Sequence, residues 1–164
     1  MPSLITNELM EFARSEFRLD WHGIHGAGHW ARVRHNGLML AAHTGANPRV
    51  VEYFAFLHDL GRENDSRDPE HGSRAATIAE NIAGDLINVS ASELTLLMDA
   101  CVGHSQGHLV ADVTVMTCWD ADRLDLGRVG IRPDPARLCN MSARQPEVIA
   151  QAYRRSVERG EQHG

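Results

Sequence analysis

The chain has 164 residues, enough for one domain with a substantial buried core. Its composition, 43 % hydrophobic and 23 % charged, is ordinary for a globular protein, and no apolar run approaches the roughly 20 residues that cross a membrane. The net charge of -6 argues against general nucleic-acid binding, which needs a basic surface. It permits a small phosphorylated ligand, because a metal ion and a few arginines can supply local positive charge.

The N-terminal segment and the cysteines bear on the cellular compartment. Glu8 and Glu11 lie where the apolar centre of a secretory signal would be, so we expect no export. The three cysteines, Cys101, Cys118 and Cys139, match neither a disulfide framework nor a cysteine-based zinc site. We therefore expect a cytoplasmic protein with reduced thiols and no membrane partner.

Helix start signals recur along the chain and short connections separate them. Asn47-Pro48 and Asp68-Pro69 each join an N-cap residue to a proline at the first helical position, and Ser90 with Glu93 has the spacing of a capping box. The predicted helices span residues 4–19, 28–44, 48–60, 69–83, 90–102, 112–126 and 146–159.

Nothing in the sequence competes with this helical pattern. The β-branched runs are short and do not alternate with polar residues, and no linker divides the chain. We predict one all-α domain over residues 1–164, a bundle of about six to eight helices. The loops 61–69, 103–111 and 127–135 remain for function, because loops on a rigid scaffold often carry it.

The adjacent residues His58 and Asp59 are the first candidates for metal binding. His58 follows Phe54 by four and Val51 by seven, so it shares their apolar helix face. A lone histidine in that position is more typical of a neutral core residue. A carboxylate at the end of so apolar a helix is costly to bury without a partner, however, and one metal ion would satisfy both groups.

Other candidate ligands are less specific when taken alone. Asp122 projects from an apolar stripe, and Asp120 and Asp125 are nearby rivals. Asp120 is not cleanly exposed either, so periodicity does not choose between 120 and 122. A salt bridge to a nearby arginine is the ordinary alternative for each aspartate. The pairs His25/His29 and His104/His108 have a spacing of four, but glycines interrupt both segments, so each pair alone is more typical of a loop.

Three motifs in order resemble one known family. They are HWARV beginning at His29, FAFLHDLGR around His58-Asp59, and ADRLD around Asp122. Together they resemble the H…HD…D pattern of the HD-domain superfamily of metal-dependent phosphohydrolases, over residues 25–128. The resemblance implies an all-α HD-type bundle and the ligands His29, His58, Asp59 and Asp122, and it favours Asp122 over Asp120. It also implies a divalent transition metal such as Mn, Fe, Zn, Ni or Co.

Members of this family with two metals have further histidines between the doublet and the last aspartate. The candidates here for a second ion or for substrate binding are His71, His104 and His108. Arginines that could bind phosphate, with ion pairs as the alternative, are Arg62, Arg67, Arg123 and Arg128. Glu63 and Asp65, in the loop after the doublet, are candidates for proton transfer.

Three functions remain open, and the first is favoured. It is hydrolysis of a small phosphorylated molecule or nucleotide by a metal-activated water. The second is a di-iron oxygenase of the same fold, with an H…HD…H…H…D ligand set. The third is a non-catalytic metal- or ligand-binding module. The doublet continues as HDLGR where many members have HDIGK, and the GYP signature of cyclic-dinucleotide enzymes is absent, so the resemblance does not supply the substrate.

Overall fold

The computed structural model describes residues 3–161, and helices dominate this part of the chain. Its α-helices are α1 (Asn7–Glu16), α2 (Ala27–Thr44), α3 (Pro48–Leu57), α4 (His71–Ile82), α5 (Ala91–Gly103), α6 (Val113–Arg123) and α7 (Pro146–Glu161). Two short 3-10 helices, η1 (Leu126–Val129) and η2 (Pro135–Arg137), lie between α6 and α7. Within residues 3–161 no β-strand forms, apart from one isolated bridge between Ala83 and Ile87, so the all-α prediction is confirmed.

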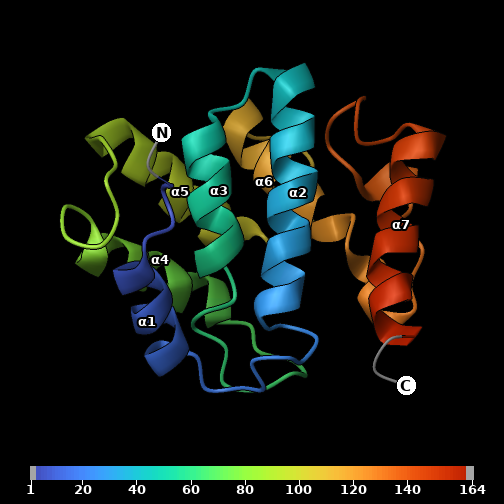
Figure 1. Cartoon of the computed structure of the whole chain (residues 1–164). Helices are drawn as coiled ribbons and strands as arrows, with labels where there is room; N and C mark the ends of the chain where they lie inside the picture. The colour runs from blue at the N-terminus through green and yellow to red at the C-terminus, as the bar shows by residue number, and fades with distance from the viewer. Residues whose placement is uncertain (1–2, 162–164) are drawn as a thin grey trace.

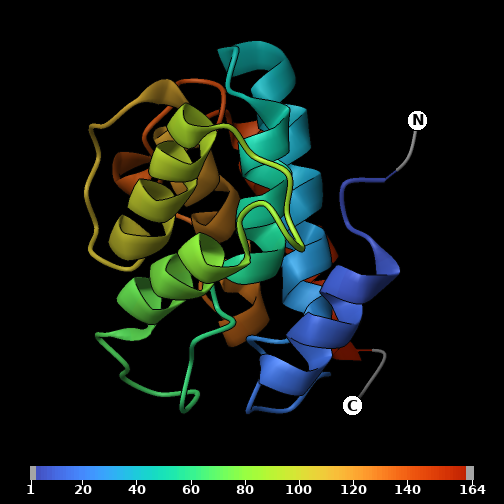
Figure 2. The ribbon, with the colours of Figure 1, turned by 90° about the vertical axis from the view of Figure 1, so that its left-hand side faces the viewer.

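Four helices form the centre of the bundle. Helix α3 contacts α2, α5 and α6, and α6 also contacts α2 and α5. Figure 1 shows α2 and α3 side by side in the middle, with α7 at one flank and α1 and α4 at the other. In the rotated view of Figure 2, α4 and α5 lie together at the front. None of the helices over residues 3–161 has the length and apolar character needed to cross a membrane.

Two clusters of buried side chains hold these helices together. The larger cluster includes Trp30, which is 0 % exposed and packs edge-on against the rings of Phe17 and Trp21 at 5.1 and 5.2 Å. The smaller cluster contains Leu124 and Ile149 and joins α7 to the segment after α6. Burial of this kind contributes about 25 cal/mol per Å² of apolar surface, which makes it the main stabilising term.

Two glycines let helices approach closely where the candidate site is built. A Cβ on Gly37 of α2 would lie 2.3 Å from Cγ1 of Val51 on α3. A Cβ on Gly72, at the start of α4, would lie 2.4 Å from the carbonyl oxygen of Cys101 on α5. Any larger residue at position 72 would therefore separate the beginning of α4 from the end of α5.

The predicted helix starts were more accurate than the predicted ends. Asn47 caps α3 by accepting a hydrogen bond from the N–H of Arg49 at 2.9 Å, and Ser90 and Glu93 form the expected capping box. Helix α3 ends at Leu57, not at residue 60, and α4 begins at His71 because residues 69 and 70 form a turn. Both differences move candidate ligands from helix interiors to helix ends.

Candidate metal centre

Side chains from the ends of five helices meet at one buried place. They come from the first turn of α2, the residues just after α3, the first residue of α4, the residue after α5, and the last turn of α6. In that order they are His29, His58-Asp59, His71, His104 and Asp122. Residues separated by up to 93 positions in the sequence are thus brought together by the packing of the bundle.

His29, His58 and Asp59 form the first group. The Nε2 atoms of His29 and His58 lie 3.0 Å apart, and Oδ2 of Asp59 lies 3.3 and 3.2 Å from them. Oδ1 of Asp122 lies 3.1 Å from Nε2 of His29 and 3.5 Å from Nε2 of His58. This Oδ1 is buried and, within the described residues, has no hydrogen-bond partner. The group could hold a metal ion, which would also satisfy the Asp122 oxygen.

The second group uses the other oxygen of Asp59. Oδ1 of Asp59 lies 3.5 Å from Nε2 of His71 and 3.4 Å from Nε2 of His104, and these two nitrogens are 2.8 Å apart. His71 and His104 are both buried. This group too could hold a metal ion, with Asp59 shared between the two groups.

In His58, His71 and His104 the other ring nitrogen, Nδ1, already has a hydrogen-bond partner. Nδ1 of His58 donates to the carbonyl of Phe54 at 3.0 Å, Nδ1 of His104 donates to that of Cys101 at 2.7 Å, and Nδ1 of His71 donates to that of Asp68. A carbonyl only accepts, so these Nδ1 atoms carry the protons, and a neutral ring then has a bare lone pair at Nε2. Where two neutral rings face each other in this way their bare nitrogens repel, and a cation between them, either a proton or a metal ion, removes the repulsion.

In the first group the histidines and the carboxylates stabilise each other's charged forms. Burial lowers the pKa of His58, but the carboxylates of Asp59 and Asp122 outweigh it and raise that pKa to about 10. Burial raises the pKa of Asp59, but the adjacent histidines, with His58 foremost, hold it well below its usual range. Positive charge among these carboxylates is therefore stabilised, whether a proton or a metal ion supplies it.

His71 in the second group behaves differently. Burial, followed by the charge of His104, lowers the pKa of His71 to about 4. The ring is therefore neutral at physiological pH, the form in which histidine binds metals.

Asp125 holds His29 in place and was not among the predicted site residues. Its Oδ2 accepts a hydrogen bond from Nδ1 of His29 at 2.7 Å, and its Oδ1 accepts one from Nε of Arg32 at 2.7 Å. The sequence feature that could have indicated it is its spacing, since Asp125 follows Asp122 by three residues, about one helical turn. A carboxylate behind a histidine ligand fixes the ring orientation and raises the basicity of the ligating nitrogen.

We expect Asp125→Asn to weaken metal binding about 10- to 100-fold without changing the number of ions bound. The reason is that asparagine keeps the shape of the side chain but loses the charge behind His29. Titration calorimetry of the metal-free protein with Zn²⁺ or Mn²⁺ measures this directly. Glu52→Gln serves as the control, because Glu52 pairs with Arg34 away from the site. Equal affinities for Asp125→Asn and wild type would contradict the assigned role.

The remaining candidates lie around the centre or away from it. His108 lies outside both groups, where its Nε2 is 3.0 Å from the side-chain oxygen of Gln106. Glu63 forms an exposed ion pair with Arg18 at 3.5 Å, and Oδ1 of Asp65 lies 2.7 Å from Nδ1 of the buried His25. Arg67 is exposed and does not line the cavity at the centre.

Asp120, the alternative to Asp122, is held by hydrogen bonds that stabilise the fold. Its carboxylate is 0 % exposed and accepts hydrogen bonds from the backbone N–H groups of Cys139 and Asn140, at 2.6 and 2.8 Å, and from Nδ2 of Asn140 at 2.9 Å. These bonds fasten the segment before α7 to α6. Burial raises the pKa of Asp120, partly offset by those donors. The structure thus separates a satisfied aspartate at 120 from an unsatisfied one at 122.

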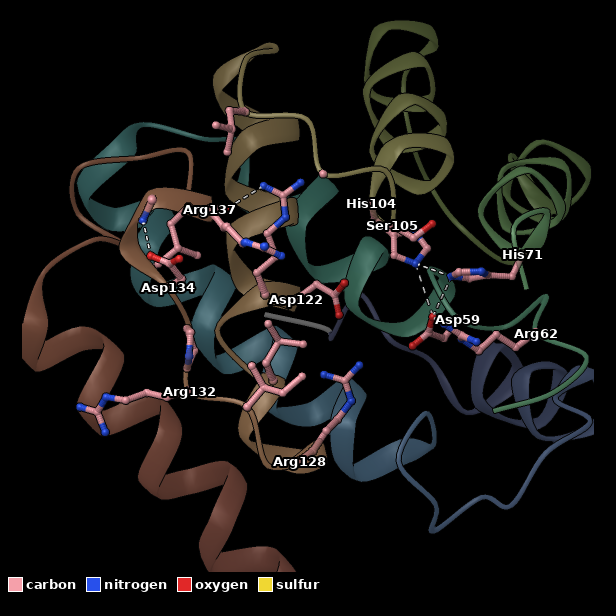
Figure 3. Close-up of a pocket in the computed structure, with 18 residues that line it drawn as sticks. Asp59, Arg62, His71, His104, Ser105, Asp122, Arg128, Arg132, Asp134 and Arg137 are labelled. Carbon is pink, nitrogen blue, oxygen red and sulfur yellow. Dashed lines mark hydrogen bonds and ion pairs between the residues drawn. The ribbon is translucent and has the colours of Figure 1, made fainter. Parts of the chain in front are cut away.

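A cavity of about 730 Å³ opens onto the centre. Asp59, His71, His104 and Asp122 line it (Figure 3), and the predicted phosphate-binding residues Arg62, Arg123 and Arg128 also line it. This volume is within the range of about 300–1,000 Å³ typical of small-molecule sites. The histidines thus border a space large enough for an organic ligand.

Comparisons with models of protein families, with curated proteins and with solved structures found no match. The resemblance to the HD-domain superfamily therefore rests on this chain's own motifs and on the grouping of its histidines and aspartates.

Proposed function

We propose that this protein is a metal-dependent phosphohydrolase of the HD-domain type that acts on a small organic phosphoester. One observation carries the proposal. Asp59 directs one carboxylate oxygen at the pair His29/His58 and the other at the pair His71/His104. A carboxylate shared between two buried histidine pairs is suited to two neighbouring ions, an arrangement common in enzymes that transfer phosphoryl groups.

The metal ions would supply a bound water of lowered pKa and neutralise charge on the phosphoryl oxygens. The protein residues would fix the ligand positions and bind the ester. His29, His58, Asp59 and Asp122 would hold the first ion, and Asp59, His71 and His104 the second. The second set has only three protein ligands and borders the cavity, so it leaves positions for water and substrate.

Arg128 is the arginine best placed for a phosphoryl oxygen. Its Nε donates to the carbonyl of Ile24 at 2.9 Å and its Nη1 to that of Asp125 at 3.0 Å, which fixes the guanidinium at the cavity wall. In Figure 3 its side chain extends toward Asp122. Fixed guanidinium groups bind phosphate oxygens with little loss of entropy. Arg62 is bound to Asp59 at 3.3 Å and would mainly orient that ligand.

The second candidate function is that of a non-haem iron oxygenase, and the composition of the second group supports it. Two histidines and one carboxylate are the ligands of many non-haem iron oxygenases, and His71, His104 and Asp59 are such a set. The arginines of the cavity favour the hydrolase, because an anionic ester benefits from them.

The test begins with elemental analysis of gently purified protein, for which we expect a stoichiometric transition metal. A metal-supplemented screen of phosphomonoesters and phosphodiesters then follows phosphate or alcohol release. Hydrolysis that chelation abolishes and metal restores would support the proposal. Absence of any bound metal, or two irons with turnover only in the presence of O₂, would overturn it.

A further inference from the structure

The outer wall of the cavity is formed mainly by one segment. Residues from 126 to 138, around η1 and η2, supply half of the cavity lining, and the segment after α5 adds His104, Ser105, Gly107 and Leu109. In Figure 3, Asp59, His71 and His104 lie at one side and Arg132, Asp134 and Arg137 at the other. The cavity therefore extends well beyond the space that a phosphoryl group at the metal centre would fill.

Positive charge is concentrated in this cavity. All 16 basic residues of the chain are arginines, and those that line the cavity are Arg62, Arg123, Arg128, Arg132 and Arg137. Besides Asp59 and Asp122, the only acid in the lining is Asp134. Its Oδ1 accepts a hydrogen bond from the backbone N–H of Ala136 at 2.9 Å. A chain of net charge -6 thus forms a cationic cavity.

The arginines of the cavity differ in how they are bound. Arg123 donates to the carbonyls of Arg137 and His108 at 3.0 and 2.7 Å, and it lies over the ring of Trp119. Arg132 lies over the ring of Tyr153 at 5.3 Å. Among the side chains described, those of residues 3–158, the guanidinium of Arg137 has neither an ion pair nor a hydrogen bond. Arg137 therefore retains all its donors for a ligand.

Apolar side chains lie on the two walls of the cavity. Leu109 and Ile131 line it and are 39 % and 53 % exposed. Leu126 and Leu138 line it as well. Exposed apolar side chains around a cavity gain free energy when an organic group covers them.

We propose that the substrate is an organic phosphoester with a second anionic group, which Arg137 binds at the far side of the cavity. The group that links the two anions lies against Leu109 and Ile131. This inference rests on the proposed function and specifies its substrate class. It excludes small sugar monophosphates as preferred substrates, since they lack the second anionic group.

The test uses two series of compounds that differ only in the second anion. One series consists of alkyl phosphates of increasing chain length, and the other carries a terminal phosphonate on the same chains. We expect kcat/KM to be about 10- to 100-fold higher with the phosphonate at the best chain length, as for one charge-assisted contact. In Arg137→Ala this preference should disappear, because the terminal phosphonate then loses its partner and the plain alkyl phosphates carry no second anion to lose. The control Arg67→Ala removes an exposed arginine outside the cavity and should keep the preference.

Binding provides a readout that does not need turnover. Titration calorimetry of the metal-loaded protein compares alkyl phosphonates with alkane bisphosphonates that carry the groups at opposite ends. We expect tighter binding of the bisphosphonates in wild type and in Arg67→Ala, but not in Arg137→Ala. Equal binding of both series in wild type, or an equal loss of both in Arg137→Ala, would overturn the inference. Absence of hydrolysis with the binding preference intact would overturn the proposed function alone.

Discussion

Replacement of Asp59 by asparagine is expected to remove metal from both groups and to lower hydrolysis by at least about a thousandfold. Each oxygen of Asp59 faces a different histidine pair, so one substitution affects both. A metal ion contributes several kcal/mol of charge stabilisation in the transition state, and about 1.4 kcal/mol corresponds to a tenfold change in rate. Metal content by elemental analysis and kcat/KM on the best ester measure the two effects.

Two further variants distinguish loss of metal from loss of structure. Asp99→Asn changes an exposed carboxylate on α5 and should leave metal content and rate unchanged. His71→Gln should remove only the second ion, so the metal content should fall by half. If Asp59→Asn retained its metal and full rate, the shared-carboxylate assignment would be wrong.

Substitutions of the two aspartates of α6 are expected to affect different properties, stability for Asp120 and metal binding for Asp122. Asp120→Ala would leave two backbone N–H groups and the Asn140 amide without their buried acceptor. Each unsatisfied donor costs about 1–3 kcal/mol, so we expect a loss of about 3–5 kcal/mol in the free energy of unfolding. Asp122→Ala removes a buried oxygen that has no hydrogen-bond partner within the described residues. It leaves the hydrogen bonds of Asp120 in place and should abolish metal binding at the first group.

Urea unfolding of the metal-free proteins, followed by circular dichroism, compares the two aspartate variants, and metal titration compares their affinities. The expected pattern is low stability for Asp120→Ala and low metal affinity for Asp122→Ala. The reverse pattern would mean that the ligand of the first group is Asp120.

Local signals in the sequence predicted the helices well because they depend on neighbouring residues. The Asn47 cap with Pro48 and the capping box of Ser90 with Glu93 both appear as expected. The end of α3 was placed too late, since the apolar pattern continues through His58 and Leu60 although the helix stops at Leu57. A turn that buries its side chains has the same composition as a buried helix, so periodicity does not mark where α3 ends.

The candidate site could be predicted only in part, because its members meet through tertiary packing. The resemblance indicated His29, His58, Asp59 and Asp122 as ligands, but chemistry alone did not choose between Asp120 and Asp122. His71 and His104 were among three candidates for a second ion, and the close contact at Gly72 brings these two together while His108 lies outside. Asp125 was missed as the partner of His29, since its spacing from Asp122 does not by itself show which side chain 96 positions away it will contact.

The position of the candidate ligands at helix ends has a consequence for how the chain folds. Apart from the adjacent His58 and Asp59, no two of them belong to the same helix or the same turn. An unfolded or half-assembled chain therefore offers a metal only that doublet, which binds weakly, and the full set exists only when all five helices have docked. Metal binding is therefore coupled to the folding of the whole bundle. A metal ion at a concentration of a hundred times its Kd would stabilise the folded bundle by about 2.7 kcal/mol, but it would not stabilise a partly folded intermediate.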